Sequence, residues 1–214
     1  IGAINYNLKG LYMIQLLKYG NTNCYYIKGK KGSILVDTDW AGTLQAFYKK
    51  VKELNITNID YLLITHYHPD HMGITQDIID NMNVKLLVID VQKDYIHCSD
   101  QIFEKNNNIN FNPICTNALI ISCKDSRRFL NDLGIDGEII YTPGHSDDSI
   151  SLILDEGIAL VGDLYDLNSA ITFNDEKINN SWNKILSHNI SKIYYGHHEQ
   201  NISNIKKIED TINN

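Results

Sequence analysis

The sequence predicts an α/β protein built as a two-sheet sandwich. Three observations lead to this prediction. The chain has 214 residues, of which 43% are hydrophobic and 21% charged, and this is enough apolar material for a sizeable core. Each half runs from segments with strand patterns to segments with helical patterns, whereas one doubly wound sheet would alternate the two throughout. No Pro- or Ser-rich linker divides the halves, so we expect one domain over residues 1–214.

Three apolar runs open the first half and have the patterns of β-strands. They cover residues 11–17, 24–27 and 33–36. Short glycine-containing turns at residues 20–21 and 29–32 separate them, which favours antiparallel hairpins. The hydrophobic period then becomes helical over residues 44–54.

The rest of the first half alternates between apolar and polar segments. Residues 61–64 and 85–89 have the continuous apolar pattern of buried strands, and we expect a helix over residues 70–82 between them. Residues 92–117 are polar and predict part helix and part loop. The Asn-rich run at 106–112 within them predicts an exposed loop.

The second half begins again with strand patterns. They cover residues 118–122, 138–142, 149–154 and 158–161. Amphipathic helices are expected over residues 178–189 and 202–212, with a strand at 192–195 between them.

Composition limits the partners and the compartment. A net charge of −7 repels phosphate backbones, so we expect a small-molecule substrate and no nucleic acid. The four cysteines form no CxxC pair, which favours reduced thiols and a cytoplasmic location. No apolar stretch approaches the roughly 20 residues of a membrane span, and no signal peptide is apparent, so no membrane partner is expected. The chain does not begin with Met, so residues 1–10 are either an added remnant or follow a removed segment.

The strongest functional signal is the segment Thr65-His66-Tyr67-His68-Pro69-Asp70-His71. Three imidazoles and one carboxylate within six residues are improbable in an ordinary polar loop, because the chain has only 8 His. Side chains alternate in an extended segment, so His66 and His68 point the same way, while Asp70 and His71 fall in the first turn of the next helix. Imidazole and carboxylate groups suit zinc and neighbouring divalent metals.

Three further donor residues follow apolar strands. They are His145 after residues 138–142, Asp163 after Gly162, and His197 after Gly196. Strand ends are where α/β proteins gather functional groups, because loops vary there on a rigid base. Each residue alone would be an ordinary turn or cap residue, but together with the first cluster they supply seven donors. A catalytic zinc takes three protein ligands, so seven donors suffice for two metal ions.

The order of these donors resembles the metallo-β-lactamase superfamily of metallohydrolases over roughly residues 11–200. Asp37-Thr38 also matches a loop that members of that family have in the first half of the chain. The resemblance implies a four-layer αββα sandwich of two mixed sheets flanked by helices, with the site at one edge between the sheets. It further implies two metals, distributed over seven ligands: His66, His68 and His145 for the first, Asp70, His71 and His197 for the second, and Asp163 as the bridge.

Departures from the family pattern narrow the subgroup. True lactamases place Cys or His where Asp163 stands, which argues against antibiotic hydrolysis. Flavin-linked diiron reductases place Glu where His68 stands and append a flavodoxin domain. Glyoxalase II enzymes and lactonases share the full ligand set, although glyoxalase II typically adds a helical C-terminal domain and about 17 residues follow His197 here. The usual Gly-His-Gly motif is Gly196-His197-His198 in this chain, and we expect His197 to be the ligand.

The expected activity is hydrolysis that depends on two divalent ions, first Zn²⁺, with Fe or Mn as alternatives. The resemblance implies that a metal-bridging hydroxide attacks a small acyl substrate, namely a thioester, an ester or a lactone. Asp70 is expected to orient this nucleophile or move its proton. The alternatives are a phosphodiesterase, an iron-dependent oxidoreductase similar to persulfide dioxygenases, and a non-catalytic metal-binding module. No GxGxxG, P-loop or GxSxG motif supports a nucleotide-dependent or serine-hydrolase function.

Several smaller features have two readings each. Asp37 either orients a metal-bound imidazole or is an ordinary turn residue. Trp40, Tyr165 and His198 either line the substrate mouth or pack against the fold. The remaining cysteines and histidines outside the donor pattern are expected to be structural or surface residues: Cys98, Cys115, Cys123, His97 and His188.

Overall fold

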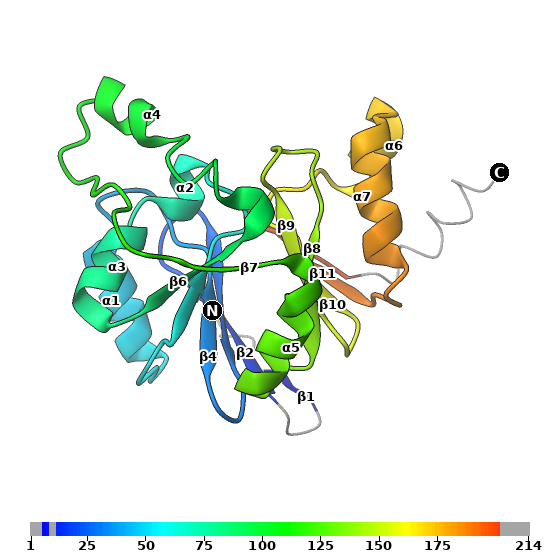
Figure 1. Ribbon diagram of the computed structural model, residues 1–214, viewed down its shortest axis with the longest axis horizontal. Helices are drawn as coiled ribbons and strands as arrows, with labels where there is room; N and C mark the ends of the chain where they lie inside the picture. Colours follow the sequence, from blue (N-terminus) through cyan, green and yellow to red (C-terminus); the bar gives the residue numbers. More distant parts are fainter. Residues whose placement is uncertain (1–5, 9–11, 202–214) are drawn as a thin grey trace.

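Two mixed β-sheets face each other across a shared apolar core, with helices on their outer faces (Figure 1). The computed structural model describes residues 6–8 and 12–201. Side chains of both sheets meet in the central core, among them Ile34 and Leu63 from one sheet and Leu152 and Leu160 from the other. The predicted two-sheet sandwich with flanking helices is therefore confirmed.

The first sheet has seven strands that follow one another in chain order. They are β1 (Tyr6–Leu8), β2 (Tyr12–Lys18), β3 (Asn23–Lys28), β4 (Ser33–Val36), β5 (Tyr61–Leu63), β6 (Lys85–Ile89) and β7 (Leu119–Ile121). Strands β1 to β4 pair antiparallel, as the short turns predict. Strands β4 to β7 pair parallel, because a helix or a long loop carries the chain back between them.

The second sheet has five strands in the order β12-β11-β10-β9-β8. They are β8 (Gly137–Tyr141), β9 (Ile150–Leu154), β10 (Ile158–Leu160), β11 (Lys192–Tyr194) and β12 (Glu199–Asn201). Only β10 and β11 are a parallel pair in this sheet, and the connection between them contains two helices.

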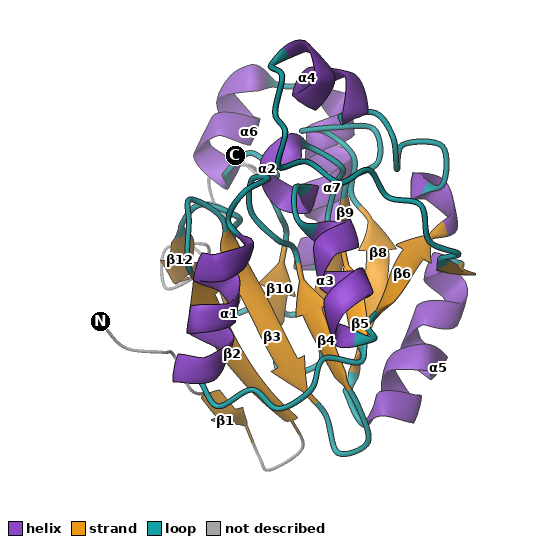
Figure 2. Ribbon diagram, turned by 90° about the vertical axis from the view of Figure 1, so that its left-hand side faces the viewer, coloured by secondary structure: helices purple, strands orange, loops and turns teal. Residues whose placement is uncertain are grey.

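Helices cover the outer faces of both sheets. Figure 2 shows α1 (Leu44–Glu53) and α3 (Thr75–Met82) in front of the first sheet, where Phe47 and Ile78 enter its outer core. On the second sheet, α6 (Leu167–Phe173) and α7 (Glu176–Leu186) bury Leu167 and Trp182. Helix α5 (Cys123–Leu133) packs beside β8 and reaches the central core through Leu130. None of the helices in the described ranges is long and apolar enough to cross a membrane.

The helix expected over residues 70–82 is broken into two, and this part of the prediction was wrong. The chain forms α2 (Pro69–Met72) and then α3, with Gly73 and Ile74 between them. A Cβ at Gly73 would lie 2.3 Å from the backbone nitrogen of Ala41. The break therefore lies where a side chain would collide with the loop after β4.

Helices α5 and α6 were not predicted, whereas α4 (Asp100–Lys105) lies within the stretch expected to be partly helical. Helix α5 is polar over most of its length and buries only Ser126 and Leu130, so few apolar positions mark it in the sequence. The helix expected over residues 202–212 lies outside the described residues.

The carboxyl ends of one parallel pair from each sheet, β4–β5 and β10–β11, meet at one edge of the sandwich. Backbone hydrogen bonds tie the sheets together at this edge. Ile150 N of the second sheet donates to Thr65 O at 3.0 Å, and Asn23 N of the first sheet donates to Gly196 O at 2.5 Å. The loops that carry the predicted donors therefore start from a fixed frame.

Candidate metal centre

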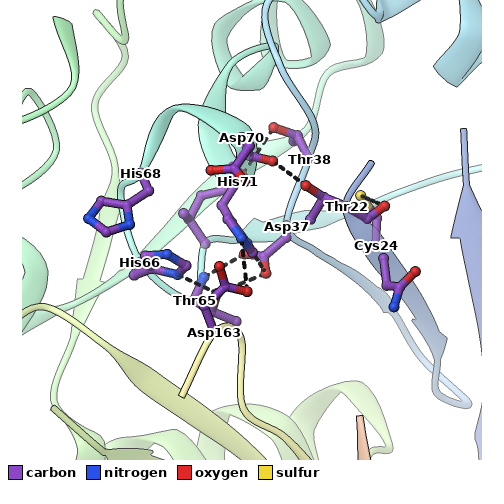
Figure 3. A network of polar contacts seen from close by, with 12 residues as sticks. Thr22, Cys24, Asp37, Thr38, Thr65, His66, His68, Asp70, His71 and Asp163 are labelled. Atoms are coloured by element: carbon purple, nitrogen blue, oxygen red, sulfur yellow. Dashed lines mark hydrogen bonds and ion pairs between the residues drawn. The ribbon is translucent and has the colours of Figure 1, made fainter. Parts of the chain in front are cut away.

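The structure brings all seven predicted donor residues together in two adjacent groups at this edge. The three-histidine group consists of His66, His68 and His145, and the mixed group consists of Asp70, His71, Asp163 and His197. Within each group, one donor atom of every residue lies within 4.8 Å of the others. Figure 3 shows His66 and His68 on one side of this cluster and Asp70, His71 and Asp163 close to Asp37.

Local backbone geometry brings the side chains of the three-histidine group together. After β5, the chain runs through residues 64–68 to α2. His68 has an extended backbone just before this helix, and Pro69 is the first helical residue. His145 follows Gly144, whose φ of 152° belongs to the region that favours glycine. The result is close packing of the rings, with His145 Nε2 at 2.9 Å from His68 Nδ1 and the His66 ring centroid 4.6 Å from that of His68.

Two glycines make room for the mixed group. Gly162 has a φ of 58° and turns the chain just before Asp163. At Gly196 a Cβ would lie 2.4 Å from Asp163 Oδ1 and 2.5 Å from His71 Cε1. A larger residue at position 196 would therefore occupy the space in which the donors converge.

Asp163 lies between the two groups. Its Oδ1 is 3.3 Å from His71 Nε2, and its Oδ2 is 3.3 Å from His197 Nε2 and 3.9 Å from His145 Nε2. Asp70 approaches the same imidazole, with its Oδ2 at 3.3 Å from His197 Nε2. One carboxylate thus faces histidines of both groups.

The protonation tendencies of the two groups differ. Burial lowers the pKa of His66, and the neighbouring histidines lower it further. Burial also lowers the pKa of His145, more than the charge of Asp163 raises it. Burial is also the largest influence on His71 and would lower its pKa, but the charges and hydrogen bonds of Asp37 and Asp163 together outweigh burial and raise that pKa. His66 and His145 therefore favour the neutral imidazole, whereas His71 in the mixed group favours the cationic imidazole beside carboxylates.

The donor set fits divalent metal ions. His66 Nε2 is a buried nitrogen without a hydrogen-bond partner, and it belongs to the three-histidine group. A buried polar atom left without a partner costs free energy, so this nitrogen calls for one. Neutral imidazole nitrogens with carboxylate oxygens are the usual ligands of zinc and related ions.

Asp37 supports the mixed group through its contact with His71. Its carboxylate accepts hydrogen bonds from Thr65 N at 2.6 Å and Thr65 Oγ1 at 2.8 Å, and lies 2.9 Å from His71 Nδ1. The residue is 2% exposed and holds a positive φ of 62°, uncommon for Asp. Of the two readings of Asp37, the contact with His71 favours the one in which it orients an imidazole, because Nε2 then faces the mixed group.

Gln92 and Asp148 form a buried polar bracket that the sequence did not reveal. Gln92 Nε2 donates to Ile64 O at 2.9 Å and to Asp148 O at 3.2 Å, and Asp148 Oδ2 accepts from Tyr67 N at 2.7 Å. Gln92 is fully buried and Asp148 is 2% exposed. The bracket joins the segment carrying His66 and His68 to the loop carrying His145. Its only sequence signal is a polar residue shortly after an apolar strand, which ordinarily indicates an exposed loop.

The three aromatic candidates for the substrate mouth differ in what their rings contact. Trp40 packs edge-on against Phe103, with ring centroids 6.1 Å apart, and the His198 ring stacks on Tyr195 at 4.0 Å. Only Tyr165 contacts a donor residue, with its ring 5.8 Å from that of His145.

The remaining cysteines and histidines are accounted for outside the two groups. All four cysteines are free. His97 pairs with Asp100 at 2.9 Å, and His188 lies 3.7 Å from Glu138.

Comparison with known proteins agrees with this geometry. A family model described as the metallo-β-lactamase superfamily matches residues 17–197. A probable metallo-hydrolase of Methanocaldococcus jannaschii is 28% identical over 204 residues, which cover 87% of this chain and 93% of that protein. A β-lactamase-like protein 2 homologue of Caenorhabditis elegans is also 28% identical, over 89% of this chain, but the chain spans only 60% of that longer relative.

Solved structures show the same fold. The crystal structure of a metallo-β-lactamase family protein from Thermus thermophilus superposes with a TM-score of 0.68 at 18% identity, covering 92% of this chain and 77% of the other. The expected family resemblance is thus confirmed by sequence and by structure. The chain belongs to the metallo-β-lactamase superfamily, whose members are metal-dependent hydrolases.

Proposed function

We propose that this protein is a hydrolase that uses two divalent metal ions to cleave a small acyl substrate, namely a thioester, an ester or a lactone. The observation that carries the proposal is the position of Asp163, whose two oxygens lie within 3.9 Å of histidines from both donor groups. A carboxylate in that position suits a bridge between two ions, and seven donors exceed what one structural zinc needs.

Each metal has a defined set of ligands in this proposal. His66, His68 and His145 hold the first ion, and Asp70, His71 and His197 hold the second, with Asp163 shared. Two bound divalent ions would supply hydroxide at neutral pH and polarise the substrate carbonyl. Zinc is the first expectation because five imidazoles and two carboxylates suit it as well as any first-row ion, and it brings no redox chemistry.

Asp70 is the acid–base group of the proposal. Its backbone oxygen accepts a hydrogen bond from Thr22 Oγ1 at 2.6 Å, which fixes the residue at the start of α2. Its side chain is 22% exposed, more open than that of Asp163 at 16%. A carboxylate that is anchored through its backbone and still open to the mouth can orient a nucleophile and pass its proton to the leaving group.

The proposal is tested by metal analysis together with a substrate panel. Fully loaded protein should contain two equivalents of zinc, and should cleave thioesters, esters or lactones in a reaction that a chelator abolishes. One equivalent or less would refute the dinuclear claim. Turnover of phosphodiesters alone, or one iron per chain with oxygen uptake, would replace the acyl hydrolase by one of the alternative activities.

A further inference from the structure

A row of aromatic rings leads from the candidate metal centre to the protein surface. The Tyr165 ring lies edge-on to His145, with centroids 5.8 Å apart, and Phe173 lies edge-on to Tyr165 at 5.2 Å. Tyr165 is 39% exposed and Phe173 is 57% exposed. Two large apolar side chains therefore remain open to solvent directly beside a predicted metal ligand.

The fold holds this pair of rings in a fixed position. Tyr165 stands two residues after Asp163, and its backbone oxygen accepts a hydrogen bond from Trp182 Nε1 at 2.9 Å. The next residue, Asp166, caps α6 by accepting from Asn168 N at 3.0 Å and Ser169 N at 3.1 Å. Phe173 ends this capped helix, which stands at the upper right of Figure 1. Both rings are thus attached to a segment whose backbone is held by these hydrogen bonds.

The two arginines of the chain and Lys177 make their contacts elsewhere. Arg127 and Arg128 lie on α5, where Arg127 pairs with Glu138 and Asp155. Lys177, on the helix after α6, pairs with Asp147 at 2.7 Å. In the described part of the chain, no cation–π contact involves Tyr165 or Phe173. This pair of rings therefore suits an uncharged apolar group better than a carboxylate or a phosphate.

We propose that Tyr165 and Phe173 form an acyl-binding wall, which binds the aliphatic or aryl portion of an uncharged ester or thioester while its carbonyl lies over the donor groups. This inference rests on the proposed function for its catalytic consequence, but the wall itself is a binding site that can be measured without turnover. It predicts a preference for longer acyl groups, because each methylene on the wall leaves water.

The first experiment compares acetyl, butanoyl and hexanoyl esters of one leaving group. Full burial of a methylene is worth about fourfold in affinity, so a half-open wall should give about twofold per methylene and at least tenfold in kcat/KM from acetyl to hexanoyl. Phe173→Ala and Tyr165→Ala should abolish this preference mainly through KM. Tyr165→Phe keeps the ring and should keep the preference. Ile120→Ala, at a 51% exposed position on β7 of the other sheet, is the matched control and should change nothing.

The second experiment measures binding without hydrolysis, by NMR titration with butanamide and octanamide. Octanamide should bind at least tenfold more tightly than butanamide to the wild type and equally weakly to Phe173→Ala. If this difference holds while no ester is cleaved, the proposed function fails and the wall stands. If esters are cleaved with no chain-length preference, or Phe173→Ala changes the oligomeric state and leaves both titrations unchanged, the wall is refuted.

Discussion

The two donor groups differ in how they are held together. The three-histidine group consists of imidazoles packed ring to ring, with His68 and His145 in nitrogen-to-nitrogen contact at 2.9 Å. It contains no carboxylate, and burial keeps His66 toward its neutral form by lowering its pKa. The mixed group instead consists of alternating imidazoles and carboxylates at distances of 3.3 Å. Only the mixed group can balance charges among its own members.

This difference indicates how each group depends on its surroundings. The three-histidine group has no carboxylate among its members, so its ligands depend mainly on correct loop geometry. In the mixed group, Asp37 at Nδ1 and Asp163 at Nε2 both favour the protonated form of His71, and a metal ion has to displace the proton of the nitrogen that it binds. We therefore expect the mixed group to bind its ion less tightly and to be the more sensitive of the two to single substitutions.

The largest effect is expected at the residue that the two groups share. Asp163→Ala should lower acyl hydrolysis at least a hundredfold, because it removes a charged group that faces both ions. Elemental analysis should show that the second ion is lost while the three-histidine group keeps the first. Asp147→Ala removes an exposed carboxylate near His145 and serves as the control. Unchanged turnover with two ions bound would show that Asp163 is not a bridge.

A somewhat smaller effect is expected at His197, which is 41% exposed, so that water can replace its nitrogen. His197→Ala should remove the ion of the mixed group and lower activity about a hundredfold, as expected for loss of a positioning element. His198→Ala is a control of the same residue type one position on, since its ring stacks on Tyr195. This variant should keep both ions. Loss of metal in the His198 variant and retention in the His197 variant would reverse the assignment.

The third prediction concerns Asp37, which supports the mixed group. In Asp37→Asn, the negative charge beside His71 is lost, and the NH₂ group, which cannot accept a proton, replaces the acceptor either of His71 Nδ1 and Thr65 Oγ1 or of Thr65 N. We expect the second ion to bind about 10- to 100-fold more weakly, with little change at the three-histidine group. Competition with a chelator, followed for each ion separately, measures this. Equal weakening at both groups would show that Asp37 supports the whole edge of the sheet.

Much of the fold could be predicted because buried strands leave a strong signal. The runs at 61–64 and 86–89 are apolar throughout, since both faces of those strands are covered. Helix α5 could not be predicted in the same way, because it buries only two side chains. The break at Gly73 depends on the approach of the loop near Ala41, and a contact across 32 positions leaves no local pattern.

The donor cluster could be predicted for a similar reason. The segment with the first four donors begins just after an apolar strand, and His145, Asp163 and His197 each follow a glycine, so the sequence itself marks these positions. The role of Tyr165 could not be separated from those of Trp40 and His198, because only the packing of the finished fold decides which ring meets His145. Gln92 was missed because its partners are backbone carbonyls, which have no residue signature.

The smallest effect is therefore expected at Gln92, and it should fall on the three-histidine group. Gln92→Ala leaves the buried carbonyls of Ile64 and Asp148 without their donor, which should lower the free energy of unfolding by about 1–3 kcal/mol. Urea denaturation measures this, with the exposed Gln101→Ala as the control. Activity should fall less than tenfold, through weaker binding of the first ion, because Asp148 Oδ2 still accepts from Tyr67 N. If instead the second ion is weakened, then Gln92 supports the sheet edge shared by both groups, and the two groups are less independent than their contacts indicate.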